Sequence, residues 1–252
     1  MLRIRSFVVL GLAAALVAAS GTYADASHAW GSYHWARASN PFELKLGDNM
    51  TTGEWKSILG VVSADWSQSS VLDTVVTAGK GGRSCKAQTG RVEVCNGRYG
   101  FNGWVGLAQI WISGSHITKG TAKMNDSYLN SATYAPYRRY VMCQEVGHTL
   151  GLGHTSEDGT NDGTCMDYSW QNETPNAHDY EQLEAIYNDH FDTVTTAKGP
   201  GNGNGNGAPD QVPGFADDGT PIGASADRGR VYVSDLPSGE RVVTFIFWAR
   251  GR

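Results

Sequence analysis

One short stretch decides the fold of this chain: residues 143–154 read CQEVGHTLGLGH. On a helix, Gln144 and His148 lie four positions apart, so both side chains project from one face. Glu145 is next to them and can reach the same ion through a bound water. The stretch therefore predicts a helix that presents metal ligands and a carboxylate together.

The chain that follows this helix supplies the remaining groups. Gly151 lets the backbone turn where a side chain would obstruct it, so His154 can return as a third ligand. A second motif, CMDY, occupies residues 165–168. The chemistry of the chain is therefore concentrated between residues 143 and 168.

These motifs resemble the signature of the metzincin clan of zinc endopeptidases, which is H-E-x-x-H-x-x-G-x-x-H followed by a Met-containing turn. Glu145, His148, Gly151 and His154 match that signature position by position. Met166 matches the methionine of the turn. The resemblance implies an α+β domain with a twisted mixed sheet, an active-site helix, a Met-turn and a C-terminal helix, plus a small C-terminal β segment.

The same resemblance implies a role for each site residue. Glu145 would be the general base for a water activated by Zn²⁺, and Tyr168 would ligate the metal at rest or donate to the oxyanion. Met166 would form an apolar floor beneath the metal. The implied zinc ligands are Gln144, His148 and His154.

Gln144 departs from the clan pattern, because it stands where the clan has its first histidine. An amide oxygen is a neutral and weaker donor than imidazole, so zinc affinity should fall. The same replacement occurs in gametolysin-like metzincins, which favours an active endopeptidase of the matrixin or gametolysin type. The alternative is an inactive pseudopeptidase that binds peptides or proteins outside the cell.

The N-terminus indicates export from the cell. Two arginines precede an apolar run over residues 7–20, and Ala24 and Ala26 are small residues at the positions that a signal peptidase reads. The run is shorter than the ~20 residues that a membrane span needs. We therefore expect a signal peptide over residues 1–26 and a secreted protein without a membrane span after cleavage.

The cysteine count fits an exported protein. An even number predicts two disulfides, and no C-x-x-C spacing supports a four-cysteine metal site. Cys85 and Cys95 bracket residues 86–94, which can form a hairpin, so local pairing is favoured there. That leaves Cys143 with Cys165, a bond that would tie the metal-binding helix to the Met-turn.

Composition limits the partners. The 252 residues carry 20 Lys and Arg against 25 Asp and Glu, a formal net charge of −5, and no basic block. This charge balance argues against electrostatic binding to nucleic acid or to an anionic membrane. A protein or peptide substrate is expected, with the chain acting as a monomer.

Patterning along the chain predicts three regions after the signal peptide. A catalytic domain is expected over residues 27–196, a Gly/Asn/Pro-rich linker over 197–219, and a small β-hairpin module over 220–252. Strands are predicted at 42–46, 71–78, 104–112 and 117–125, and helices at 51–62, 137–150 and 178–190.

Other polar residues allow further interpretations. His116 is the best substitute ligand if Gln144 does not bind the metal. Glu157, Asp158 and Asp162 lie in a Gly-rich loop, which is either a solvated acidic loop or a structural Ca²⁺ site. A third class of function, surface attachment through the C-terminal hairpin, also remains open.

Overall fold

The computed structural model describes residues 28–188, 191–192 and 231–250. The predicted signal peptide, the predicted linker and residues 220–230 of the predicted hairpin module lie outside the described residues. In the ranges described, no helix combines the length and the apolar character needed to cross a membrane.

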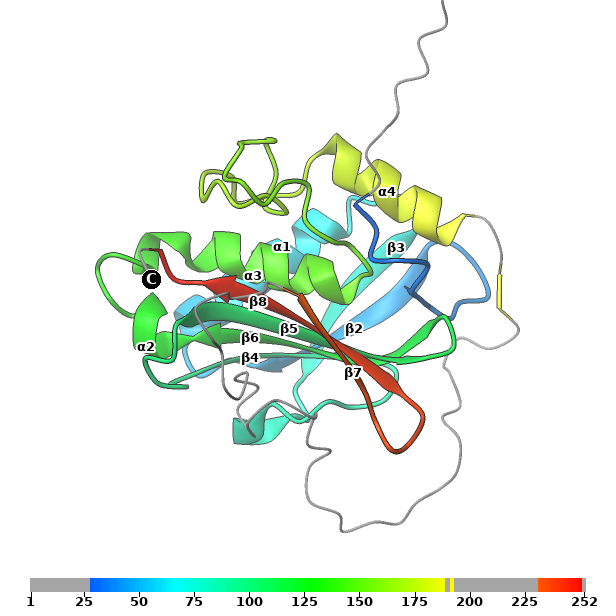
Figure 1. The fold of residues 1–252 in the computed structure, drawn as a ribbon, viewed down its shortest axis with the longest axis horizontal. Helices are drawn as coiled ribbons and strands as arrows, with labels where there is room; N and C mark the ends of the chain where they lie inside the picture. Colours follow the sequence, from blue (N-terminus) through cyan, green and yellow to red (C-terminus); the bar gives the residue numbers. More distant parts are fainter. Residues whose placement is uncertain (1–27, 189–190, 193–230, 251–252) are drawn as a thin grey trace, which may run out of the picture.

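The described strands form one eight-stranded mixed sheet with the order β3-β2-β4-β6-β5-β8-β7, and β1 pairs with β6 (Figure 1). Strands β1, β2, β3, β4 and β6 are parallel to one another, whereas β5 is antiparallel to β6, and β8 is antiparallel to both β5 and β7. The strands are β1 (His34–Trp35), β2 (Phe42–Asn49), β3 (Leu72–Ala78), β4 (Val92–Gly97), β5 (Trp104–Ser113), β6 (His116–Asn125), β7 (Val231–Asp235) and β8 (Arg241–Trp248).

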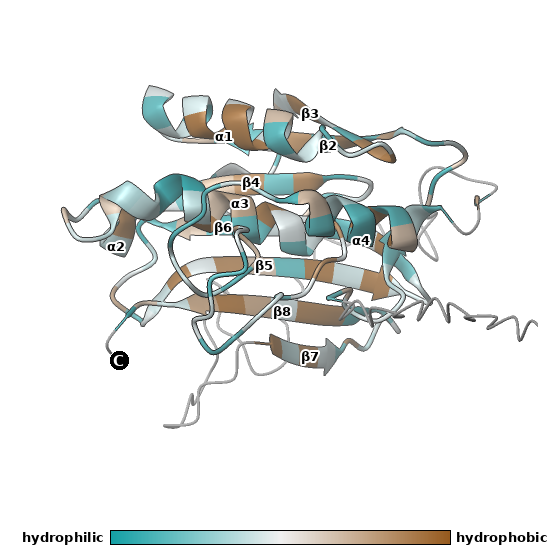
Figure 2. Cartoon of the chain, turned by 90° about the horizontal axis from the view of Figure 1, so that it is seen from above, coloured by the Kyte–Doolittle hydropathy of each residue, from teal (hydrophilic) through white to brown (hydrophobic). Residues whose placement is uncertain are grey.

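The three longer helices lie over one face of this sheet, as the two views in Figures 1 and 2 show. Thr52 caps α1, its side chain accepting a hydrogen bond from the Trp55 amide, and Asn176 forms a capping box at the start of α4. The α+β class is confirmed. The helices are α1 (Gly53–Trp66), α2 (Asp126–Leu129), α3 (Arg138–Thr149) and α4 (Ala177–Tyr187), with 3₁₀ turns at Gly82–Ser84 and Ala135–Tyr137.

The predicted helices and strands are present, with ends shifted by a few residues, but one central strand was not predicted. Residues 86–94 do not form a hairpin, because β4 lies between β2 and β6 as a parallel strand. Glu93 hides the pattern of this strand: it is fully buried, and its charge is paired with Arg91 at 2.7 Å. Because two charged residues are buried as an ion pair, the sequence of this core strand resembles that of a half-exposed one.

The predicted C-terminal hairpin is present, and it extends the main sheet. Strand β8 pairs with β5 from Trp104↔Trp248 to Ile112↔Arg241. Its side chains alternate between two apolar clusters. Val243, Phe245 and Phe247 join the main core beneath α3, whereas Val242 and Ile246 pack on the opposite face with Trp104, Leu107 and Trp111.

Candidate metal centre

Helix α3 carries three of the predicted site residues into the interior. Gln144 and Glu145 are 0% exposed and His148 is 1% exposed. The helix packs on β5, β6 and β8 and against α1, so nearly its whole circumference is buried. Its polar side chains therefore need partners inside the protein.

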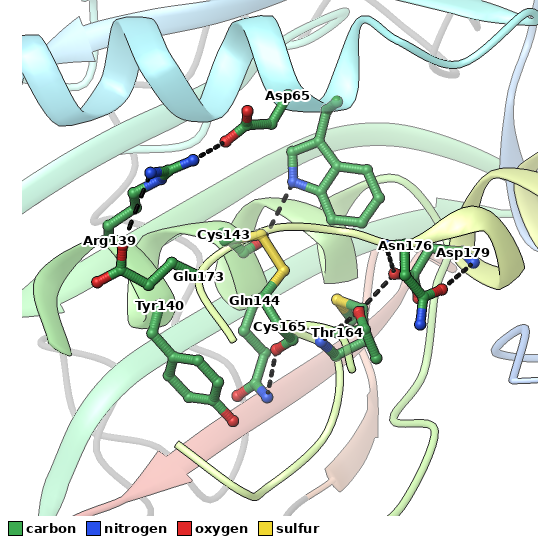
Figure 3. The surroundings of a disulfide bond; sticks show 12 residues. Asp65, Arg139, Tyr140, Cys143, Gln144, Thr164, Cys165, Glu173, Asn176 and Asp179 are labelled. Atoms are coloured by element: carbon green, nitrogen blue, oxygen red, sulfur yellow. Dashed lines mark hydrogen bonds and ion pairs between the residues drawn. A yellow bond between two sulfur atoms is a disulfide. The ribbon is translucent and has the colours of Figure 1, made fainter. Parts of the chain in front are cut away.

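Gln144 is held by the segment that contains the predicted Met-turn. The Cys143–Cys165 disulfide joins α3 to that segment, and the Gln144 Nε2 donates to the carbonyl of Cys165 at 3.0 Å (Figure 3). The same nitrogen also donates to the carbonyl of Asp167 at 2.7 Å. The buried Oε1 has no hydrogen-bond partner among the described residues. With the nitrogen fixed by two carbonyls, this oxygen is left to accept a ligand. The second disulfide, Cys85–Cys95, is also present.

Met166 packs directly against the helix. A Cβ at Gly147 would collide with the Met166 sulfur and with the Trp66 ring, so the glycine makes room for both. Met166 itself is 0% exposed. The methionine thus lies against α3 in an apolar setting, beside the turn that Gln144 contacts.

His148 has the protonation pattern of a metal ligand. Its Nδ1 lies 2.9 Å from the Leu152 carbonyl, so Nδ1 carries the hydrogen and Nε2 keeps its lone pair. Burial, and then the charge of His154, hold the pKa of His148 well below its ordinary value. The imidazole is therefore neutral, as a metal ligand must be.

His154 reaches the same place after a turn at Gly151. That glycine has φ +104°, a conformation that side chains rarely adopt, and a Cβ there would meet the Tyr33 carbonyl at 2.7 Å. The rings of His154 and His148 lie 4.5 Å apart and nearly perpendicular. Glu157 was not predicted to take part, yet its Oε1 lies 3.1 Å from the His154 Nδ1 and orients the ring. The three-residue spacing between His154 and Glu157 was the sequence feature that could have indicated this contact.

The carboxylate of Glu145 is buried without the hydrogen bonds that would offset its loss of hydration. Neither oxygen has a hydrogen-bond partner among the described residues, and burial raises its pKa well above the ordinary value. A Cβ at Gly106 of β5 would overlap the carboxylate, so this glycine creates its space. Unpaired buried oxygens on both Gln144 and Glu145 fit a cation held beside them, because such a charge offsets the cost of burial.

Tyr168 packs against the ring of His154. The two ring centroids are 4.6 Å apart, and the Tyr168 hydroxyl donates a hydrogen bond to the backbone carbonyl of Ile246 at 3.1 Å. The hydroxyl is thus positioned to donate to a peptide carbonyl. A pocket of roughly 390 Å³ lies beside it, lined in part by Glu157, Trp248 and Arg250.

His116 belongs to a different group. His34, His116 and Asp192 place one possible ligand atom each within 4.8 Å of one another. However, His116 Nε2 is already 2.9 Å from one Asp192 oxygen, and the Arg37 amide donates to the other at 3.1 Å. The Arg37 guanidinium, 3.8 Å from that carboxylate, opposes a second cation there.

The acidic loop has partners within the protein. Asp158 accepts a hydrogen bond from the Thr160 amide at 2.8 Å, and Glu157 is the partner of His154 described above. Glu157 of this loop therefore contacts the candidate ligand His154. A calcium site in this loop stays a prediction.

Comparison with known proteins finds similar solved structures. One is myroilysin, at 12% identity and TM-score 0.40, covering 65% of this chain and 99% of that chain. Another is high choriolytic enzyme 1, a hatching enzyme zinc-protease from Oryzias latipes (medaka fish), at 12% identity and TM-score 0.39, covering 63% and 96%. No family model matches the chain, and no curated protein matches it.

The disulfide between Cys143 and Cys165 should support the site as well as the fold. Replacing both cysteines by Ala is expected to cost about 3 kcal/mol of stability and to lower Tm by ~6–12 °C. Zinc affinity should fall as well, because Gln144 loses its fixed carbonyl partners. Replacing Cys85 and Cys95 by Ala is the matched control, which should cost similar stability and leave zinc affinity unchanged. Equal zinc affinity in both variants would count against the supporting role.

Glu145→Gln should stabilise the metal-free protein, and more so at high pH. Because the folded-state pKa of Glu145 is raised, the folded state binds more protons than the unfolded state, and stability is lost as pH rises. Removing the carboxylate removes that loss. We expect a Tm increase of ~4–8 °C at pH 8 and a smaller one at pH 5, measured by calorimetry with a chelator present. A larger increase at pH 5 than at pH 8 would refute this reasoning.

Proposed function

We propose that the chain is a secreted zinc-dependent endopeptidase that cuts extracellular proteins or peptides and acts as a monomer. The observation that carries the proposal is the pair His148 and His154, whose rings lie 4.5 Å apart while both Nδ1 atoms are engaged by oxygen partners. This is how protein zinc sites fix imidazoles for coordination through Nε2. Gln144 Oε1 is the third proposed protein ligand.

A zinc ion held by these three residues would supply Lewis-acid polarisation of a water and of the scissile carbonyl. Glu145 would accept the proton of the attacking water and deliver it to the leaving amine. Burial raises the pKa of Glu145, and this direction supports the role, because an acid–base group works best when its pKa lies closer to the operating pH than that of an ordinary carboxyl group.

Tyr168 is proposed to donate to the oxygen that becomes negative as the peptide bond is attacked. Support comes from its hydrogen bond to the Ile246 carbonyl, which is itself the oxygen of a peptide group. Glu157 would act as a positioning residue through the Nδ1 of His154. Met166 would keep the floor of the site apolar.

The second candidate is a pseudopeptidase that binds peptide without cutting it. Gln144 favours this reading, since an amide oxygen is a weaker zinc donor than imidazole. Retention of Glu145 favours catalysis, because an unpaired buried carboxylate costs stability and has no packing role.

A broad peptide-library assay separates the two candidates. Purified protein starting at residue 27, with β8 released as described below, is incubated with the library without additions, with a chelator, and with zinc restored after chelation. Hydrolysis that disappears with the chelator and returns with zinc is the expected result. A folded, zinc-loaded chain that cuts no peptide, even after release of β8 as described below, would leave the pseudopeptidase as the better account.

A further inference from the structure

Gln144, Glu145 and His148 of the proposed catalytic centre are closed to solvent, and strand β8 covers the His148 ring. Phe245 of β8 lies flat on the His148 ring, with centroids 4.2 Å apart and planes 6° apart. Phe247 packs edge-on against the Tyr168 ring at 4.9 Å. Both phenylalanines are at most 1% exposed, so a peptide bond cannot reach His148 while β8 is in place.

The same strand also closes the space around the proposed base. The carboxylate of Glu145 packs at Gly106 of β5, and the register partner of Gly106 on β8 is Phe247. Glu145 is fully buried there. An endopeptidase with this geometry therefore needs β8 to move before it can act on a substrate.

Strand β8 lies in the manner of a bound peptide. It is extended and antiparallel to β5 over the register from Ile112↔Arg241 to Trp104↔Trp248. Its Ile246 carbonyl accepts the hydrogen bond from Tyr168, the proposed oxyanion donor. Main-chain pairing of this kind accepts any extended segment, with side-chain pockets supplying the preference.

The hairpin is also separable from the rest of the fold by its position in the chain. Strands β1–β6 and all four helices are complete before residue 192, and the hairpin returns only after residues 193–230. Strand β7 contributes little to the core, since its five residues are exposed or partly exposed. A two-stranded hairpin is marginal alone, so this one depends on docking against β5.

We propose that the edge of β5 is a strand-binding surface, that the hairpin of residues 231–250 occupies it as an inhibitor in cis, and that its release opens the centre to peptide. The catalytic consequence rests on the proposed function, whereas the strand-binding surface does not. The preferred occupant is an extended segment with aromatic residues two positions apart, as Phe245 and Phe247 are.

The test uses the full chain with a recognition sequence for a site-specific protease placed within residues 201–207. Before cutting, the tether keeps the hairpin at a high effective concentration near β5. After cutting, dilution lets the hairpin leave. All binding measurements carry Glu145→Gln, so that the probe is not consumed. The probe is a fluorescein-labelled peptide of residues 239–249 with three added lysines.

A matched control locks the hairpin in place from the face opposite the centre. Gln109 and Thr244 are register partners, and their side chains are hydrogen-bonded at 3.1 Å. Directly paired residues of antiparallel strands have Cα separations that a disulfide can span. Gln109→Cys with Thr244→Cys should therefore hold β8 on β5 after the chain is cut, without touching the proposed ligands.

The cut, diluted chain is expected to bind the probe at least about tenfold more tightly than the uncut chain or the cut and locked chain. Equal probe affinity before and after cutting would overturn the inference. Loss of helical circular dichroism when the hairpin leaves would also overturn it, because β8 would then be a permanent part of the core. Hydrolysis separates the two proposals: a cut chain with Glu145 restored that binds the probe but cuts nothing refutes the endopeptidase alone. Equal hydrolysis by uncut and cut chains refutes the hairpin inhibitor alone.

Discussion

Glu145→Gln is expected to lower kcat/KM for peptide hydrolysis by about 10³-fold, within the range that general acid–base groups contribute. The amide keeps the size of the side chain and its place against Gly106, but it cannot take a proton from water. Zinc content should stay at the wild-type value, since Gln144, His148 and His154 are untouched. The rate is measured on the chain after hairpin release.

Glu173→Gln is the matched control for this change. The Glu173 side chain is 46% exposed and pairs with Arg139 at 3.6 Å, and it is not one of the proposed ligands. The Glu173→Gln substitution makes the same chemical change, carboxylate to amide, at an exposed position. Comparable losses in the two variants, or full activity of Glu145→Gln, would exclude Glu145 as the general base.

His148→Ala should reduce zinc affinity by more than ~100-fold, because changes to groups that merely orient a ligand already cost 10–100-fold. The Nε2 of His148 is the best prepared ligand atom in the structure: the ring is buried, and its Nδ1 is fixed by Leu152 at 2.9 Å. Affinity is measured by competition with a chromogenic chelator.

His116→Ala distinguishes this centre from the group formed by His34, His116 and Asp192. Because Asp192 is already paired with His116 and with Arg37, removing His116 should leave zinc affinity unchanged. If His116→Ala releases the zinc while His148→Ala retains it, the metal centre has been placed in the wrong part of the molecule.

The ligand-bearing helix could be predicted from sequence because its information is local. Gln144, Glu145 and His148 share a helix, Gly151 follows at the turn, and His154 comes three residues later. The pairing of Cys143 with Cys165 also followed from a short list of possibilities. Such features depend on spacing within about 25 residues, which a single sequence displays directly.

The closing of the centre by β8 could not be predicted in the same way. The nearly continuous apolar run over residues 242–248 indicates a strand, but nothing local indicates which edge it joins. Gln109 and Thr244 are paired across 135 positions, and such a contact is decided by the complementarity of two finished surfaces. The partner role of Glu157 was missed because an acidic loop residue is usually solvated.

The most direct test of the central claim is anomalous X-ray diffraction at the zinc edge from crystals of the zinc-loaded protein. We expect one strong peak in contact with Gln144 Oε1, His148 Nε2 and His154 Nε2. A peak between His34, His116 and Asp192, or no peak in a folded chain with both disulfides formed, would contradict it.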